Sequence, residues 1–195
     1  MQRDQLVGNT LEANRVYASK LAETTQNFLL SAQQQLAYSA TRLGEADMDP
    51  RQAQGEASRL QLQSSSFNSS LVVDADGLVI ATSPQTLQLQ GEILHSAGNN
   101  AALASRQPMI SDPYQSATGK LLVSLSHPIF DGQGRYRGYI SGTLYLRQRS
   151  ALHTLLGTHY YRDGSYLYVV DRHGRLLYLS LIHIPSPRDQ RGSRM

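Results

Sequence analysis

Hydrophobic and polar positions alternate with a period of two through the middle of the chain, which predicts a β-sheet there. The clearest stretch is residues 119–146, in which two runs rich in Leu, Val, Ile, Tyr and Thr flank the turn FDGQGR of residues 130–135. Such a pattern is typical of a β-hairpin. We therefore predict strands over residues 120–129 and 136–146 and take this hairpin as the centre of an antiparallel sheet.

The N-terminal part of the chain has a helical pattern instead. Residues 1–43 contain no proline, and their apolar positions recur at helical or heptad spacing. We predict one amphipathic helix over residues 10–43, with Gly44 as its C′ residue. Two interpretations stay open, because a helix of this length can simply overhang the sheet or can act as a stalk that carries a signal or pairs with a partner chain. The apolar positions are Leu6, Leu11, Leu21, Phe28, Leu29, Ala32, Leu36 and Leu43.

Shorter elements are predicted between this helix and the hairpin. Asp49 followed by Pro50 is typical of an N-cap and first helical position, so a second helix should run to about residue 63. The turn DADG should join two strands that belong to the same sheet. We expect these strands over residues 67–74 and 78–82, a helix around residues 99–105, a strand over residues 107–111 and a loop over residues 112–118.

A second unit begins after the hairpin. The stretch SYLYVVDRHGRLLYLS repeats the pattern of SLVVDADGLVIATS, since both read as an apolar strand, a D-x-x-G turn and another apolar strand. We predict a short helix over residues 147–156 and strands over residues 165–171 and 175–178. The simplest interpretation is an internal repeat whose second copy is truncated.

The last fifteen residues follow none of these patterns. The segment LIHIPSPRDQRGSRM looks like translated sequencing-adapter sequence, so we interpret residues 181–195 as a non-native tail. The alternative is a basic tail of the natural chain. Three arginines and one aspartate of this segment supply two of the three net positive charges of the protein, so the remainder is nearly neutral and indicates no nucleic-acid surface.

Composition excludes several kinds of chemistry. The chain has no cysteine, which excludes disulfides and thiolate sites. It has no run of about eighteen apolar residues that would predict a transmembrane helix. Its six histidines form no zinc-binding pair, and no nucleophile elbow or phosphate loop is present. We therefore expect no catalytic residues, no metal and no cofactor in this chain.

One face of the predicted sheet carries hydroxyl groups and aromatic rings. Tyr139, Ser141 and Thr143 share a face by period two, together with Tyr145, and serines alternate with apolar residues on the neighbouring strand. A small-molecule pocket typically has a few polar groups of this kind within an apolar surrounding. The alternative is that these groups only hydrogen-bond to covering loops. The candidate ligand-binding residues are Ser124, Tyr139, Ser141 and Thr143 on the sheet, Ser111, Asp112 and Tyr114 at the rim, and Arg106 as a partner for an anionic ligand.

Taken together, these elements resemble a known family. The long helix, the VVDADGLVIATS hairpin, and the segments DPYQSATGK and PIFDGQGRYRGYI resemble the double Cache sensor domains of bacterial transmembrane receptors over about residues 10–178. The sequence LLGTHYYRDGSYLYVVD is most similar to the sensor regions of membrane-bound GGDEF diguanylate cyclases. The resemblance implies an α+β fold, in which the long helix packs on a PAS-like antiparallel sheet, with a truncated second Cache unit.

The resemblance also implies an organisation of the chain. Residues 1–63 would be the stalk helix and a short helix, residues 64–149 the membrane-distal unit, and residues 150–180 the start of a membrane-proximal unit. The parent protein would be anchored in the inner membrane, with this part on its periplasmic face and a homodimer formed through the N-terminal helix.

This sequence departs from the amino-acid-sensing members of the family. Those members carry an aspartate at the position of Thr143 and a tryptophan, whereas this chain has no tryptophan. Tyr114 does match the tyrosine of the family loop. The comparison argues against a free α-amino acid and leaves a carboxylate, a purine-like ring or no small ligand open.

We therefore predict a non-enzymatic, extracytoplasmic sensor of an unknown small molecule, whose parent protein regulates cyclic-di-GMP synthesis. The alternatives are the sensor of a chemotaxis receptor or histidine kinase, and an interaction module without a ligand.

Overall fold

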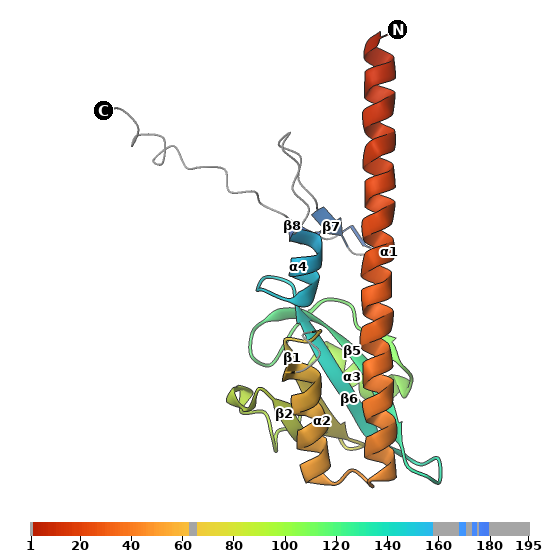
Figure 1. The fold of residues 1–195 in the computed structure, drawn as a ribbon. Coiled ribbons are helices and arrows are strands. Elements are labelled where there is room, and N and C mark those ends of the chain that lie inside the picture. Colours follow the sequence, from red (N-terminus) through yellow and green to blue (C-terminus); the bar gives the residue numbers. More distant parts are fainter. Residues whose placement is uncertain (1, 63–65, 158–167, 171–172, 175, 180–195) are drawn as a thin grey trace, which may run out of the picture. The chain divides into compact units, whose positions relative to one another are not determined.

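The structure is a computed structural model that describes residues 2–62, 66–157, 168–170, 173–174 and 176–179 (Figure 1). Contacts divide the chain into two units, residues 1–155 and residues 156–195, and each is described by itself. The prediction of a non-native tail over residues 181–195 lies outside the described residues.

Helix α1 (Gln2–Glu45) is the longest element, and it confirms the helix predicted over residues 10–43. At 1.5 Å per residue its 44 residues span about 66 Å, so its N-terminal half extends past the sheet of the same unit (Figure 1). Leu36 and Leu43 in the C-terminal half are fully buried, and in the N-terminal half Leu11 is 64% exposed while Leu21 is buried. The core shared with the sheet involves the C-terminal half of the helix.

The predicted end of α1 is wrong by two residues. The helix continues through Gly44 to Glu45, and the left-handed residues are Asp47 and Met48. A Cβ atom at position 44 would collide with the backbone carbonyl oxygen of Phe130. Gly44 is therefore required by the close approach of the hairpin formed by β5 (Leu121–Phe130) and β6 (Tyr136–Tyr145) rather than by a helix cap.

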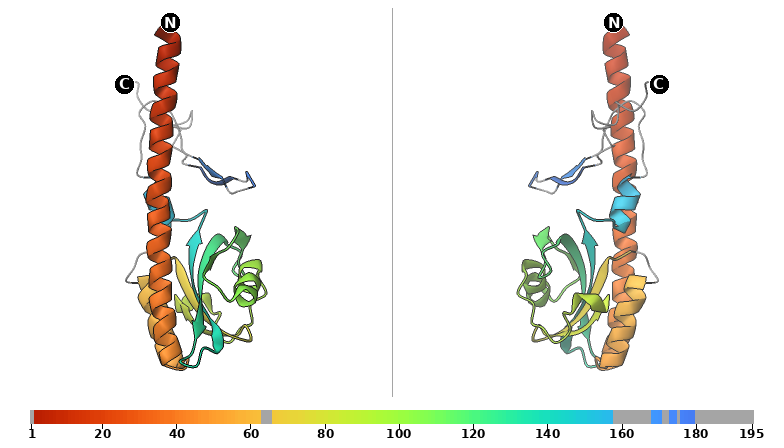
Figure 2. Two further views of the ribbon diagram at one scale, coloured as in Figure 1. Left: turned by 90° about the vertical axis from the view of Figure 1, so that its right-hand side faces the viewer. Right: turned by 90° about the vertical axis from the view of Figure 1, so that its left-hand side faces the viewer.

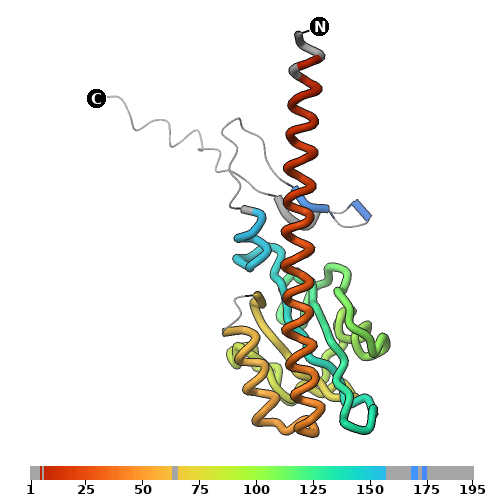
Figure 3. Tube along the Cα trace, turned by 45° about the vertical axis from the view of Figure 1, so that its right-hand side comes forward, coloured from red at the N-terminus to blue at the C-terminus, as the bar shows by residue number. Residues whose placement is uncertain are grey.

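Helix α2 (Pro50–Leu62) runs beside α1 and begins where the sequence predicts (Figure 3). The Asp49 Oδ1 atom accepts hydrogen bonds from the N–H groups of Arg51 and Gln52, each at 3.0 Å, which confirms Asp49 as the N-cap. The apolar face of α2, which contains Ala57 and Leu60, joins the same core as the C-terminal half of α1.

The six strands of the first unit form one antiparallel sheet in the order β2-β1-β6-β5-β3, with β4 also paired to β5. The central hairpin β5–β6 and the hairpin β1–β2 are both confirmed. One correction concerns residues 112–118, which were predicted as a loop but include the two-residue strand β4. The strands are β1 (Ser69–Asp74), β2 (Val79–Ser83), β3 (Met109–Ile110), β4 (Tyr114–Gln115), β5 (Leu121–Phe130) and β6 (Tyr136–Tyr145).

Helices α1 and α2 cover one face of this sheet, and the short elements cover the other (Figure 2). Alternate residues of β6 divide between the faces, since Ile140 and Leu144 pack in the core with α1 whereas Tyr139 packs in a second core. The elements over this second face include η1 (Gln85–Leu87) and α3 (Ala97–Ser105). We call it the loop face.

A buried ionic cluster links α1 to α2. Glu56, 7% exposed, accepts a hydrogen bond from the Ser39 hydroxyl at 2.8 Å and forms an ion pair with Arg59 at 2.9 Å. Arg42 adds a second ion pair at 3.5 Å. Because a buried carboxylate needs such partners, this cluster fixes the two helices in one register.

The turn between β5 and β6 is held by Asp131. Its Oδ1 atom accepts hydrogen bonds from the N–H groups of Gln133 at 2.9 Å and Arg135 at 3.0 Å, and its Oδ2 atom pairs with the Arg135 guanidinium at 2.8 Å. The backbone hydrogen bond from Arg135 is the main cause that lowers the pKa of Asp131 to about 2. The carboxylate therefore stays charged in this turn.

Along the chain after β6, α4 (Ala151–Gly157) crosses the boundary between the two units. It is followed in the second unit by a hairpin of β7 (Tyr168–Val170) and β8 (Leu176–Leu179). Helix α4 starts four residues later than predicted, because the Ser150 hydroxyl caps it by accepting the N–H of His153 at 3.1 Å. The described parts of the two predicted strands pair antiparallel as expected.

Candidate ligand-binding site

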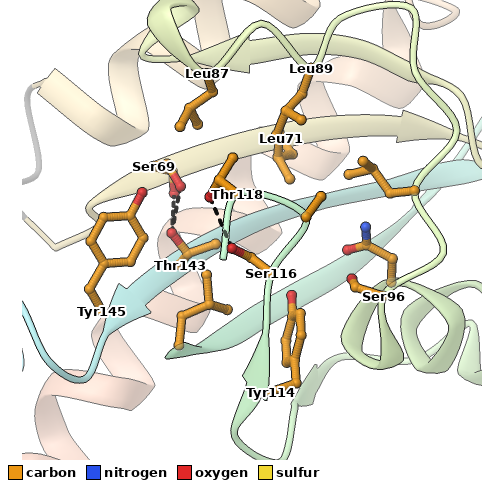
Figure 4. Close-up of a pocket in the computed structure, with 14 residues that line it drawn as sticks. Ser69, Leu71, Leu87, Leu89, Ser96, Tyr114, Ser116, Thr118, Thr143 and Tyr145 are labelled. Atoms are coloured by element: carbon orange, nitrogen blue, oxygen red, sulfur yellow. Dashed lines mark hydrogen bonds between the residues drawn. The ribbon is translucent and has the colours of Figure 1, made fainter. Parts of the chain in front are cut away.

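A small cavity lies on the loop face of the sheet (Figure 4). Its floor comes from β1, β5 and β6, and its walls come from the segment around η1, the start of α3, and the turn between β4 and β5. Its volume is about 30 Å³, room for one or two water molecules. The lining residues are Ser69, Leu71, Leu87, Leu89, Leu94, Ser96, Asn99, Tyr114, Ser116, Ala117, Thr118, Leu122, Thr143 and Tyr145.

The floor carries a buried pair of hydroxyl groups. Ser69 on β1 and Thr143 on β6 are directly opposite in the strand register, and their hydroxyl oxygens lie 2.6 Å apart (Figure 4). Both side chains are almost fully buried. Each hydroxyl has one donor and two acceptor positions, so the pair keeps capacity to bind a polar group in the cavity.

Tyr114 forms one wall and depends on a glycine of α3. Its ring lies against Gly98, where a Cβ atom would overlap the ring and hydroxyl atoms. Burial raises the pKa of the Tyr114 hydroxyl, and hydrogen bonds with Ser124 and Ser96 oppose this rise. The hydroxyl is therefore neutral at physiological pH and is anchored between the sheet and α3.

The turn between β4 and β5 closes the cavity from outside. It is held by the Ser116 N–H, which donates to the Lys120 carbonyl at 2.9 Å, and by the Gly119 N–H, which donates to the Ser116 carbonyl at 2.9 Å. The hydroxyls of Ser116 and Thr118 lie 3.0 Å apart. This turn joins a strand of only two residues, so few hydrogen bonds oppose its displacement.

The start of α3 also reaches the cavity. Ser96 is the N-cap residue, makes no side-chain capping hydrogen bond, and lines the cavity together with Asn99 of the first turn. The N-terminus of a helix carries a partial positive charge and unpaired N–H donors. The fourteen side chains that line the cavity include no Asp, Glu, Lys, Arg or His, so the lining itself carries only this partial charge.

Tyr114 and Thr143 are the two predicted residues that line the cavity, and Ser124 supports Tyr114 from behind. Ser111 is buried beside them, where its hydroxyl accepts the Ser124 N–H at 2.9 Å. Ser141 is buried on the same sheet face but does not reach the lining.

Three other predicted residues lie outside the lining. Arg106 ends α3 in an exposed left-handed conformation, with its guanidinium 4.9 Å from the centre of the Tyr136 ring. Asp112 is exposed. Tyr139 is 1% exposed, and burial, with smaller contributions from Tyr114 and Tyr136, raises its pKa well above the usual range. Their roles in ligand binding stay predictions.

Several lining residues were not among the candidates. Ser69 and Leu71 share the face by alternation in the strand predicted over residues 67–74, so this signal was available. Tyr145 is predicted to lie on the same strand face as Thr143 but is not among the candidate ligand-binding residues. By contrast, no periodic pattern in the sequence predicts which segments cover the sheet. These segments contribute Leu87, Leu89, Ser96 and Asn99 to the lining.

Within the described part of the chain, no group of three or more His, Asp or Glu side chains could hold a metal ion. None of the described helices has the length and apolar character needed to cross a membrane.

A family model matches more than half of the chain. Residues 28–145 match the model described as HK/GC/Chemotaxis protein-like, sensor domain. This range covers the packed half of α1, α2 and the whole sheet. No curated protein sequence matches.

Several solved structures share the fold. An extracellular ligand-binding receptor from Desulfohalobium retbaense has a TM-score of 0.73 at 18% identity, with 82% of this chain and 29% of that chain covered. The ligand-binding domain of the Pseudomonas fluorescens chemoreceptor CtaA, solved with L-isoleucine, has a TM-score of 0.60 at 19% identity, with 82% and 64% covered. That of the Pseudomonas aeruginosa amino acid chemoreceptor PctB, solved with L-Gln, has a TM-score of 0.61 at 20% identity, with 88% and 66% covered. The chain therefore spans less than two thirds of each of these structures.

Proposed function

Because the chain belongs to the family of HK/GC/chemotaxis protein-like sensor domains, we propose that it binds a small molecule outside the cytoplasm as part of a transmembrane receptor. The observation that carries this proposal is the cavity on the loop face, where buried hydroxyl groups and leucines meet under a weakly held turn. Such a combination of apolar wall and few polar groups is typical of small-molecule sites.

Ligand entry requires the cavity to open. Its volume of about 30 Å³ is smaller than any metabolite needs, and sites for small molecules usually have several hundred Å³. The turn of residues 116–120 is the element that moves with the fewest broken contacts, because β4 pairs with β5 over two residues only. The described conformation is then the closed one, and a ligand would bind to an open one.

Strand β6 connects the cavity with α1 and would transmit the signal. Its residue Thr143 faces the cavity, whereas Leu144 next to it packs in the core with Leu36 of α1. A ligand that displaces β6 would therefore change the packing of α1. The resulting shift is limited by the difference in ligand affinity between the two arrangements.

The cellular setting is part of the same proposal. Residues 64–149 would be the membrane-distal unit, and the receptor would present it on the periplasmic face of the inner membrane. The output domain would be a GGDEF diguanylate cyclase, on the resemblance of the sequence. The family description also names histidine kinases and chemotaxis proteins, so a chemotaxis receptor fits equally well.

We expect Tyr114→Ala and Thr143→Ala to weaken ligand binding without unfolding the sheet unit. Tyr114 is a wall residue, and Thr143 loses only a hydroxyl and a methyl group. The measurement is the shift in unfolding temperature with a ligand found by screening metabolites. For the wild-type chain, a ligand at one hundred times its Kd raises the free energy of unfolding by about 2.7 kcal/mol.

Thr154→Ala is the matched control, since its hydroxyl donates to the Ser150 carbonyl at 3.2 Å and lies outside the lining. If both cavity variants keep the full ligand-induced shift, the cavity is not the binding site. If no metabolite shifts the wild-type chain, the alternative of an interaction module without a ligand is favoured.

We also propose that the chain forms a homodimer through α1. Val16 and Leu30 are 60% and 48% exposed, and they lie two heptads apart on a face other than the packed stripe of Leu36. We expect Leu30→Asp to raise the dissociation constant of the dimer at least about tenfold, equal to 1.4 kcal/mol. Sedimentation equilibrium measures this constant. Leu11→Asp, on the side of the packed stripe, is the control and should leave the dimer intact. A wild-type chain that stays monomeric at high micromolar concentration would contradict the proposal.

A further inference from the structure

The charge of the cavity lining restricts the chemistry of the ligand. The lining contains five leucines, one alanine and eight polar residues, but it contains no Asp, Glu, Lys, Arg or His. The hydroxyl of Tyr114 is kept neutral by burial. An ionic group of the ligand would therefore have no side chain of opposite charge beside it.

The surroundings disfavour a cation in particular. The ammonium of Lys120 lies 4.4 Å from the centre of the Tyr145 ring, and Tyr145 itself lines the cavity. The N-terminus of α3, with Ser96 and Asn99 in the lining, adds a partial positive charge. A ligand ammonium group would lose its hydration without a carboxylate partner in the lining, close to these positive charges.

An oxygen acceptor is favoured by the same features. One hydroxyl of the Ser69–Thr143 pair donates to the other, so the second hydroxyl proton of the pair can donate to a ligand, and so can N–H groups in the first turn of α3. Five leucines form an apolar part beside these donors: Leu71, Leu87, Leu89, Leu94 and Leu122. The lining is thus complementary to a molecule with an apolar body and an oxygen-bearing end.

We infer that the ligand of this cavity carries no ammonium group and presents a carbonyl, hydroxyl or carboxylate oxygen on a small apolar body. This inference rests on the proposed function, since it names the class of molecule that the same site takes. It excludes free amino acids and amines as ligands of the cavity.

The test uses matched probes on the full chain. Isopentyl, cyclohexylmethyl and benzyl bodies are each supplied as the carboxamide, the carboxylate, the primary amine and the corresponding α-amino acid, and the change in unfolding temperature is measured at millimolar concentration. We expect a carboxamide or carboxylate of at least one body to raise the unfolding temperature. The amines and amino acids should give no shift, and the positive shift should be lost in Tyr114→Ala.

A gain of binding provides the internal control. Thr143→Asp introduces a carboxylate on the cavity floor, so this variant should bind the amine whose body matches the best wild-type probe and should lose the carboxylate. An amine or amino acid that shifts the wild-type chain, with loss of the shift in Tyr114→Ala, would overturn the inference while the sensor function stands. If no probe shifts either the wild type or Thr143→Asp, the cavity does not take small molecules and the proposed function itself fails.

Discussion

Leu36→Asp is expected to prevent folding of the sheet unit. Leu36 is fully buried in the core that α1 and α2 form with the sheet. Loss of a buried leucine costs about 2–5 kcal/mol, and a buried carboxylate without a partner adds several more. This sum is comparable with the whole stability of an ordinary domain, about 5–15 kcal/mol. Circular dichroism followed on heating should show loss of the cooperative thermal transition.

Leu11→Asp is the matched control on the same helix. The side chain of Leu11 is 64% exposed, in the half of α1 that extends past the sheet. Its replacement should change the free energy of unfolding by less than about 1 kcal/mol, because exposed positions tolerate charge. If Leu36→Asp unfolds at the wild-type temperature, the core between α1 and the sheet is wrongly described.

Gly98→Ala is expected to reduce ligand affinity at least about tenfold, equal to 1.4 kcal/mol. The new Cβ atom would overlap the ring and hydroxyl of Tyr114, so the ring must leave its place between α3 and the sheet. Movement of the ring separates its hydroxyl from Ser124 and Ser96 and removes one wall of the cavity. The affinity for the best probe, measured by calorimetry, checks this expectation.

Gly55→Ala separates this effect from a general effect of glycine in a helix. Gly55 lies inside α2, and a Cβ atom there would meet nothing within 4 Å. Alanine is a better helix former than glycine by about 1 kcal/mol, so this variant should gain stability and keep the wild-type affinity. Equal affinities for Gly98→Ala and the wild type would show that Tyr114 does not contribute to the site.

Leu36→Asp and Gly98→Ala test two different kinds of contact. The sequence predicts the first kind but not the second. Leu36 belongs to a helical stripe that the sequence shows directly. The contact between Gly98 and Tyr114 joins residues of a helix and a separate strand, and no local pattern indicates it.

The sequence by itself determined the elements that follow one regular period. The heptad spacing of Leu36 and Leu43 predicts α1, and the alternation in residues 119–146 predicts the β5–β6 hairpin. The face that carries Thr143 also follows from this alternation, because successive side chains of a strand point to opposite sides. Local capping chemistry at Asp49 likewise gave the start of α2.

Only the tertiary structure decided which residues meet across separate segments. Arg106, at the left-handed end of α3, has its guanidinium 4.9 Å from the centre of the Tyr136 ring, a contact between separate segments that no local pattern indicates. Ser96 and Asn99 reach the cavity only because α3 is held over the sheet. Gly44 is needed where a backbone carbonyl of a hairpin more than eighty residues away approaches α1. Such contacts depend on how irregular segments pack, which periodicity along the chain does not encode.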